Sequence, residues 1–441
     1  MKRLSLVICF ILLIFLLTSC TTDSKEIDDQ VYTLVIGADK AINNKVRVTV
    51  QFPTYKSGGE GMSGTQKKGG GGGEGNKDET GEVSGTIVET VEAPTLLEAV
   101  DLLNTSTTRR ISLVQTKEII FSEDLAKEGI GKYLEPIARF RETRRTIQVV
   151  VCRGTAEDFI KESKTLIGDS LAKSMELMFI ESSNTGFFPH VTFHDFYAGM
   201  LNPYSMAYAA YAGLNDFSKL KPLKGEASSP LKTEYEILPG EIPRKGDLKR
   251  EFFGTAVFDG EKMVGSLNAS ETRYFLMVRG EFKRGIITIA DKDNPDLAIP
   301  LDIRLGRKTK IKAHFENGRP VIDVKLNIES DLGAIQSREK YERLSKINDL
   351  NSQIDAYIQK GIVKTIEKTQ KEWGTDIFGF GGYVARNFLT VPEFEKYNWL
   401  AHYRDAKINV DVSVNVRRTG LMMSSSSIRN SKDTIIINRE P

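Results

Sequence analysis

Hydrophobic and polar positions alternate near the start of the chain. Valine or phenylalanine stands at every second position from Val46 to Phe52, with polar residues between. A period of two is typical of a half-buried strand. Residues 31–39 predict its hairpin partner, and the alternation returns at residues 86–91. Eleven of the 27 residues at 56–82 are glycine, which predicts a long flexible loop between two strands.

The middle of the chain mixes short strands with short helices. Pro94 and Thr95 can open a helix, and Asp259-Gly260 is a strong hairpin dipeptide. The predicted strands are residues 114–121, 146–152, 254–258, 263–265, 285–290 and 297–305, and the predicted helices are residues 95–103, 122–129, 171–181 and 271–278, with another after Thr155. Helices and strands do not alternate strictly, as they would in a doubly wound sheet. The pattern therefore indicates the α+β class.

The last third of the chain predicts a sheet of its own. Residues 309–315 and 321–328 read as strands joined by a turn at Asn317-Gly318. Alternation over residues 407–416 predicts one more strand at the end.

A long helix is predicted between these strands. From Leu344 to Ile366, apolar residues recur at steps of three or four. This spacing predicts one apolar stripe that lies against a sheet. A coiled-coil dimer is the alternative, but Gly361 interrupts the stripe and no heptad persists.

The first twenty residues have the three parts of a secretory signal peptide. Lys2 and Arg3 are followed by an apolar run from Leu4 to Leu17, and small residues then precede Cys20. A cysteine at this position resembles a bacterial lipoprotein signal, which implies diacylglycerol transfer to Cys20 and cleavage before it. A retained transmembrane helix is the alternative. Fourteen residues would span only ~21 Å, short of the ~30 Å hydrocarbon core.

Charge and cysteine content narrow the possible partners. Without Lys2 and Arg3, the chain keeps 59 basic against 59 acidic side chains, and no basic run is interleaved with aromatic residues. This balance argues against nucleic acid as a partner. Cys152 is the one cysteine outside the signal and the lipid position. It lies in a predicted buried strand without a nearby base, so a buried bystander is favoured over a catalytic thiol.

Catalytic and ligand-binding motifs are weak throughout. His190 and His194 are four residues apart with Asp195 adjacent, a spacing that can hold zinc on a helix. Pro189 precedes them and no third ligand is evident, so no metal site is expected. Residues 70–75 begin and end in glycine but lack the lysine and helix of a phosphate-binding loop. No serine nucleophile motif with a suitable histidine occurs either.

Two motifs near the C-terminus have competing interpretations. The glycines at residues 379–382 follow a helix rather than a strand, which argues against a dinucleotide site. They more readily permit a tight turn that docks Phe378 and Phe380 into a core. Arg417-Arg418 could recognise a carboxylate or a lipid phosphate. The simpler interpretation is a pair of strand-end charges that meet nearby Asp or Glu.

Several segments together resemble the Ger(x)C family, the C subunits of spore germinant receptors. The stretch from Val35 to Lys40 is similar to the family's first strand, with Ala38 where isoleucine is usual. Residues 254–265, followed by Glu271-Thr-Arg273, resemble its middle block. The run Thr375-Asp-Ile-Phe-Gly-Phe-Gly381 resembles its "ADIFGFG" motif. Val114-Gln115 stand where the family often has a histidine, so no role is given to that position.

The resemblance assigns motif positions across nearly the whole mature chain. We interpret these positions as structural, and Cys20 as the lipid anchor. The motif residues are Gly37, Asp39, Gly254, Phe258, Gly265, Asp376, Phe378, Gly379, Gly381, Arg417, Arg418, Thr419 and Gly420.

The resemblance also implies a function and a location. It implies a membrane-anchored, non-enzymatic subunit, without cofactor or metal, that acts with integral membrane subunits A and B in the inner membrane of a dormant spore. The receptor would respond to small nutrients, and whether this subunit touches them is left open. The alternative is an independent extracytoplasmic lipoprotein that binds a solute or hydrolyses a substrate.

The family fold implies three consecutive α+β domains, in agreement with the composition shifts along the chain. The predicted division is a signal peptide at 1–19, a lipid-anchored tether at 20–30, an N-terminal domain at 31–195, a middle domain at 196–300, a C-terminal domain with the long helix at 301–421 and a tail at 422–441.

Overall fold

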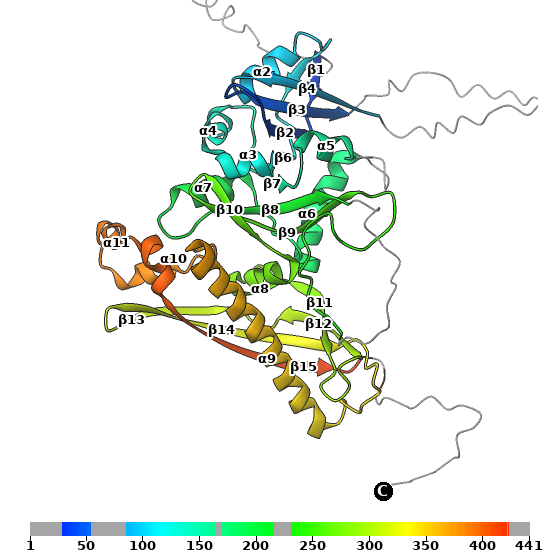
Figure 1. Cartoon of the computed structure of the whole chain (residues 1–441), viewed down its shortest axis with the longest axis vertical. Helices are drawn as coiled ribbons and strands as arrows, with labels where there is room; N and C mark the ends of the chain where they lie inside the picture. Colours follow the sequence, from blue (N-terminus) through cyan, green and yellow to red (C-terminus); the bar gives the residue numbers. More distant parts are fainter. Residues whose placement is uncertain (1–28, 54–84, 164–169, 216–230, 421, 423–441) are drawn as a thin grey trace, which may run out of the picture.

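The computed structural model describes residues 29–53, 85–163, 170–215, 231–420 and 422. Cys20, the predicted signal peptide and the predicted glycine-rich loop lie outside the described residues. Helices and strands are mixed, which confirms the α+β class. The described strands form two large sheets that follow one another along the long axis of the molecule (Figure 1). A short parallel pair, β1 (Gln30–Tyr32) and β5 (Arg110–Ser112), lies beside the first sheet.

Eight strands of the described chain form the first sheet, in the order β10-β9-β8-β7-β6-β2-β3-β4. They are β2 (Val35–Lys40), β3 (Val46–Pro53), β4 (Thr86–Ala93), β6 (Glu118–Ser122), β7 (Gln148–Cys152), β8 (Tyr208–Leu214), β9 (Arg250–Asp259) and β10 (Lys262–Leu267). The central strands β2, β6, β7 and β8 are parallel, and the outer strands are antiparallel. Parallel strands are buried on both faces, which is why β6 and β7 are almost continuously apolar.

Helices cover both faces of this sheet. One core contains apolar residues of α2 (Leu96–Leu103), α3 (Glu123–Glu128), α4 (Gly131–Arg139) and α7 (Phe193–Leu201). The core on the opposite face contains those of α5 (Ala156–Lys161) and α6 (Leu171–Thr185). Thr95 and Thr155 cap α2 and α5 with their side-chain oxygens, as the sequence predicts for helix starts.

The second sheet is built around one long strand. Its strands are β11 (Arg284–Ala290), β12 (Ala298–Leu305), β13 (Lys310–Glu316), β14 (Arg319–Leu332) and β15 (Lys407–Arg418). β14 pairs antiparallel with β12 and β13 and parallel with β15. A parallel pair needs a crossover, and the chain between β14 and β15 includes the long helix α9 (Leu344–Lys368). Asn317 and Gly318 both have positive φ, which confirms the predicted tight turn.

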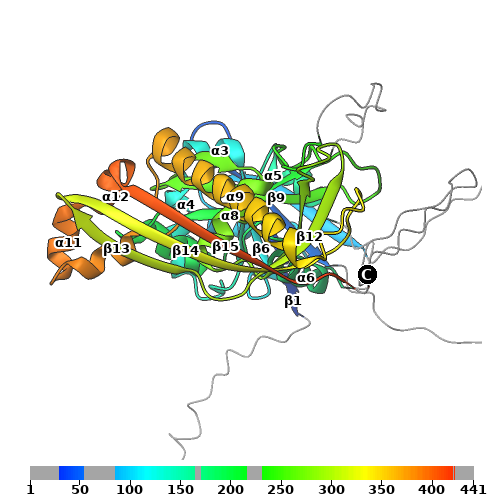
Figure 2. The same cartoon turned by 90° about the horizontal axis from the view of Figure 1, so that it is seen from below.

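The apolar stripe of α9 packs against other elements of the same chain. Leu350, Ile354, Ile358, Ile362 and Ile366 are at most 1 % exposed, and α9 lies along β15 (Figure 2). This arrangement confirms the predicted helix on a sheet and makes the coiled-coil alternative wrong, because the stripe is already covered. α9 continues through a π-helical turn, η3 (Thr369–Trp373).

Helix α8 (Ala269–Arg279) joins the two sheets into one core. It packs on β9 of the first sheet and on α9, the helix that covers the second sheet. One apolar cluster therefore runs from Val257 and Leu267 to the isoleucines of α9. Beyond α9, the chain forms α10 (Gly381–Val384), η4 (Ala385–Asn387), α11 (Val391–Tyr397), α12 (Trp399–His402) and η5 (Tyr403–Asp405).

The structure corrects several predicted elements. β3 is buried on both faces rather than half-buried, because Thr49 hydrogen-bonds Thr90 (3.0 Å) and Gln51 donates to the Ser163 carbonyl (3.0 Å). Residues 114–117 form a turn instead of strand, since the Thr116 hydroxyl donates back to the Leu113 carbonyl (2.8 Å).

Turn and boundary predictions differ in detail from the structure. The two-residue loop of the β9–β10 hairpin is Gly260-Glu261, one position later than predicted, because Asp259 pairs with Lys262. Helices α4 and α7 and strand β8 were not anticipated by the sequence pattern. The boundaries predicted at residues 195 and 300 fall inside α7 and β12, and the three-domain division stays a prediction.

Candidate functional site

The described motif residues gather at helix starts, at strand contacts and at the junction between the two sheets. Near the N-terminus, Asp39 is the penultimate residue of β2 and accepts hydrogen bonds from the backbone N–H groups of Ala156 (2.7 Å) and Glu157 (3.0 Å). A carboxylate at this place satisfies the free N–H groups at the start of α5. Burial is the larger effect and raises the pKa of Asp39 above its ordinary value. On Gly37, a Cβ would lie 2.5 Å from the Ile160 side chain, so the glycine admits α5 onto the sheet.

The motif residues of the β9–β10 hairpin serve packing. Gly254 has φ +121°, and its N–H donates to the Phe187 carbonyl (2.7 Å). Phe258 is fully buried, with its ring edge-to-face against Phe196 at 5.0 Å between centroids. A Cβ on Gly265 would overlap the indole ring of Trp373 in η3, so this glycine brings the hairpin and the C-terminal unit together.

Asp376 is the centre of the junction. Its side chain is fully buried and accepts hydrogen bonds from the N–H groups of Gly379 (2.9 Å) and Gly381 (3.0 Å) and from the Trp399 indole (2.8 Å). Burial nevertheless raises the pKa of Asp376, because removal from water outweighs the three donors. The Asp376 carboxyl group therefore fixes the backbone turn that follows it and holds the Trp399 indole in place.

The same loop contacts both sheets. The Asp376 carbonyl accepts from the Met206 N–H (2.7 Å), in the segment that leads into β8, and the Ile377 carbonyl accepts from Arg279 of α8 (3.1 Å). Gly379 has φ +79°, as the predicted tight turn requires. The turn buries Phe378 and Phe380, whose rings stack at 5.2 Å between centroids. The predicted docking of both rings into the core is confirmed.

Sequence reasoning did not identify the partners of this loop. Met206 and Arg279 are distant from Asp376 along the chain, and nothing in their local pattern marks them. The same holds for Trp373, which is distant from its partner Gly265. Their roles depend on contacts that only folding brings about.

The C-terminal motif lies at the end of β15. Arg417 forms an ion pair with Glu329 of β14 (3.1 Å), and Arg418 is paired in register with Asp331. Thr419 donates to the Met422 carbonyl (3.4 Å), and Gly420 has φ +76°. The geometry of Arg417 favours the strand-end interpretation over recognition of a lipid phosphate.

The histidine pair does not share a helix face. α7 begins at Phe193, after His190, and Asp195 is engaged in a capping box with Thr192. The zinc spacing is therefore not realised, because Pro189 and the capping residue place His190 outside the helix. Within the described residues, no group of three or more His, Cys, Asp and Glu side chains could hold a metal ion.

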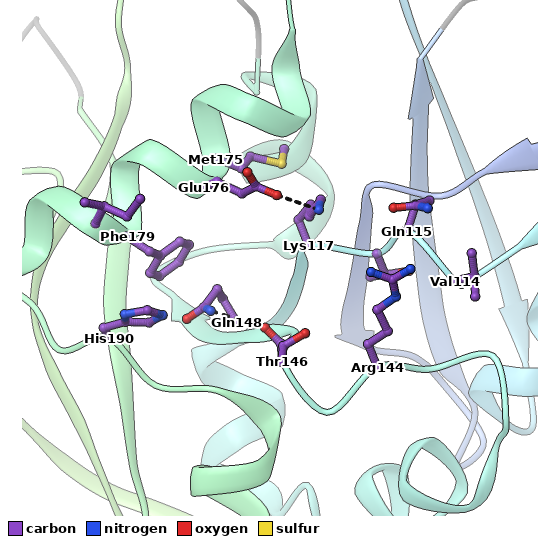
Figure 3. A pocket seen from close by; sticks show the side chains of 12 residues that line it. Val114, Gln115, Lys117, Arg144, Thr146, Gln148, Met175, Glu176, Phe179 and His190 are labelled. Carbon is purple, nitrogen blue, oxygen red and sulfur yellow. Dashed lines mark hydrogen bonds and ion pairs between the residues drawn. The ribbon is translucent and has the colours of Figure 1, made fainter.

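His190 instead lines a cavity of about 280 Å³ between α6, the 114–117 turn and β7 (Figure 3). Lys117 reaches across its upper side to Glu176 of α6, with 2.7 Å between Nζ and Oε1. The Phe179 ring lies beside His190, with 6.0 Å between ring centroids, and desolvation lowers the pKa of this imidazole. The cavity has polar groups but shows no nucleophile beside a base.

Cys152 is buried at the end of β7. Desolvation raises the pKa of its thiol well above the ordinary value. The thiolate is therefore suppressed, which favours the buried-bystander interpretation.

Comparison with known proteins connects these features. A family model described as "Spore germination protein N-terminal domain" matches residues 23–214, and one described as "Spore germination B3/ GerAC like, C-terminal" matches residues 253–420. The first covers most of the eight-stranded sheet, and the second begins within β9 and contains the whole second sheet.

Similar full-length relatives occur in Bacillus. The putative spore germination protein YfkR of Bacillus subtilis (strain 168) is 23% identical over 425 residues, covering 95% of this chain and 97% of that protein. Spore germination protein KC of the same strain is 23% identical over 438 residues, with the same coverage. Spore germination protein GerQC of Bacillus cereus is 20% identical over 414 residues, covering 94% and 98%.

The fold is shared with a solved structure. The crystal structure of the GerBC protein superposes with a TM-score of 0.50 at 17% identity, covering 86% of this chain and 96% of that one. Across the described part of the chain, each helix is too short or too polar to cross a membrane. With both family models matched in order, and with relatives aligned over almost their whole length, the chain belongs to the Ger(x)C family of spore germination proteins.

Proposed function

We propose that this protein acts in spore germination as the C subunit of a nutrient germinant receptor. The observation that carries the proposal is the collinear match of both family models, at residues 23–214 and 253–420, behind a lipoprotein-type signal that ends at Cys20. In this role the chain is a binding and scaffold subunit, not an enzyme, and acts with integral membrane subunits A and B.

The proposed location is the outer face of the spore inner membrane. A diacylated Cys20 would make a durable anchor, since several acyl chains hold firmly where a single one binds only marginally. β1 begins at Gln30, and the ten residue steps from Cys20 can span at most ~35 Å. The folded part would therefore stay close to the bilayer and within reach of integral partners.

The packing role of the motif residues supports a scaffold. Asp376, Gly381 and Phe378 hold the two sheets together and do not line an open cleft with a nucleophile and base. A subunit whose task is to present fixed surfaces to partners needs such a rigid junction.

Deletion of the gene tests the role directly. We expect the mutant to form normal spores that fail to respond to particular nutrients, with the response restored by the wild-type gene. We also expect the protein to co-purify with the A and B subunits from spore membranes after cross-linking. Normal germination with every nutrient and no association with A or B would contradict the proposal and favour an independent solute-binding or hydrolytic lipoprotein.

A further inference from the structure

Helix α8 contains a buried guanidinium for which the described part of the chain offers no carboxylate partner. Arg273 is only 6% exposed, yet among the described residues no Asp or Glu lies within salt-bridge distance of it. Two partly buried arginines differ, since Arg250 pairs with Glu118 (2.6 Å) and Arg279 with Glu281 (2.7 Å). Burial of a charge without a counterion is costly, so Arg273 needs a specific reason to stand there.

The contacts of Arg273 use part of its donor set. Nε donates to the Thr185 carbonyl (2.9 Å) and Nη1 to the Ile286 carbonyl (2.7 Å), while the Phe187 ring covers one face at 3.8 Å from Cζ. A guanidinium has five N–H donors. Three of them therefore lack an acceptor within the described part of the chain. Desolvation lowers the pKa of Arg273 to about 10, so the group is still a cation at neutral pH.

These donors adjoin a cavity of about 290 Å³ at the junction of the two sheets. Hydroxyl side chains from five segments line it, and Arg273 is the one charged residue among the described residues around it. The hydroxyl residues are Thr185, Thr233, Tyr235, Ser270, Tyr274, Thr288 and Tyr357. Pockets at such junctions, with a few convergent polar groups, are typical ligand sites, and this volume suits a small molecule.

We propose that this cavity binds a small carboxylate, which completes the hydrogen bonding of Arg273. The planar guanidinium fork matches a carboxylate in two parallel hydrogen bonds. The side chains of Ser270 and Thr288 also line the cavity with hydroxyl groups that can donate to the same anion, whereas the Tyr274 hydroxyl donates to Glu234 (3.4 Å). Ile286 offers an apolar wall for a short aliphatic chain. A purely structural role would account for the bonds to Thr185 and Ile286, but not for three further donors on a guanidinium that lines a cavity.

Binding can be measured on the full-length protein in detergent, with sodium acetate as probe and sodium chloride at equal ionic strength as reference. We expect acetate to raise the melting temperature saturably beyond chloride, because a ligand that binds the native state stabilises it. Saturation-transfer NMR should show contact of the acetate methyl group with the protein. Inorganic phosphate is the second probe, and a response to phosphate without acetate would overturn the carboxylate assignment.

Two variants locate the site. Arg273→Lys keeps the charge but loses the fork, and we expect acetate binding at least about tenfold weaker. Thr288→Leu fills the cavity without changing Arg273 and should abolish the acetate effect. Arg284→Lys, on the same strand β11 but exposed and paired with Asp302, is the matched control and should bind like wild type.

The outcomes separate cleanly. The proposal is overturned if wild type responds equally to acetate and chloride, or if Thr288→Leu binds acetate normally. Should Arg273→Lys fail to fold, the cavity-filling variant still decides. The measurement uses the isolated chain, so its result does not depend on whether the protein acts in a germinant receptor.

Discussion

At the scale of single residues, the loop from Asp376 to Gly381 at the junction of the two sheets depends on one carboxyl group and on one position without a side chain. Asp376 collects three N–H donors, and Gly381 lies where a Cβ would overlap the Tyr204 carbonyl and the Trp399 ring. The adjacent Gly382 has open space around its Cα. A side chain can therefore be added at Gly382 without a clash but not at the neighbouring Gly381.

We expect Gly381→Ala to lower the free energy of unfolding by about 1–3 kcal/mol, because the new methyl group forces buried neighbours to move. Gly382→Ala is the matched control and should be neutral or stabilising by up to about 1 kcal/mol, since alanine favours the helix. Denaturant unfolding of the two variants measures both values. Equal effects at the two positions would contradict the packing argument.

The raised pKa of Asp376 predicts a pH dependence. A carboxyl group whose pKa is higher in the folded state binds more protons there than in the unfolded state, so its contribution to stability is largest below the unfolded pKa of about 3.8 and falls as pH rises through the folded pKa. We expect Asp376→Asn to destabilise most near pH 4 and progressively less at higher pH. Unfolding free energies of both proteins from pH 4 to pH 7 test this, and a loss that grows with pH would refute it.

At the scale of elements, a glycine in the long helix has a clear purpose. Gly361 interrupts the apolar pattern of α9, and in the structure a Cβ there would overlap the ring of Tyr274 on α8. The glycine lets the two helices approach closely. A feature that weakens the helix by itself therefore serves the packing of two helices.

We expect Gly361→Ala to destabilise the protein by about 1–3 kcal/mol through this overlap, although alanine is intrinsically the better helix former by about 1 kcal/mol. Lys360→Ala, at the neighbouring exposed position, should change stability by less than about 0.5 kcal/mol. Thermal or denaturant unfolding provides the comparison. A stabilised Gly361→Ala variant would mean that α8 and α9 do not meet as described.

Most elements with strong periodicity were predictable. The stripe of α9, the alternation in β15 and the turn at Asn317-Gly318 depend on neighbouring residues, so the local pattern is sufficient. β8 was missed because Tyr208–Leu214 is rich in alanine and glycine, which have low strand propensity and gain their place only by pairing with β7 and β9.

At the scale of the whole molecule, the two sheets share one apolar core. Phe378 packs edge-to-face on Phe275 of α8 at 5.5 Å, and the same cluster includes residues of β9, β10 and α9. Because the described parts are joined in this way, we expect cooperative unfolding of both sheets.

Calorimetry of the wild-type protein should therefore show one transition, with calorimetric and van't Hoff enthalpies in agreement. Phe378→Ala removes the ring at the junction, which should cost about 3–5 kcal/mol and separate the transition into two. Two well-separated transitions in the wild type would show that the junction is too weak to couple the sheets.

The proposed lipid anchor at Cys20 also concerns the whole molecule. We expect Cys20→Ala to prevent labelling by a fatty-acid probe and either to release the folded part from membranes or to block processing of the signal, because the acylated thiol is gone. Metabolic labelling and membrane fractionation measure this, with Cys152→Ser as the control that keeps labelling. Unchanged labelling and retention in Cys20→Ala would remove the anchor from the proposed function.

The sequence alone determined the strongly periodic elements and the family resemblance, because periodicity, turn dipeptides and motif order are local or collinear properties of the chain. The tertiary structure decided which strands pair, why Gly265, Gly361 and Gly381 must be small, and that Arg273 lies beside a cavity with no counterion among the described residues. The partners in these contacts lie far apart along the chain. Their meeting depends on the packing of whole elements, which no local pattern encodes.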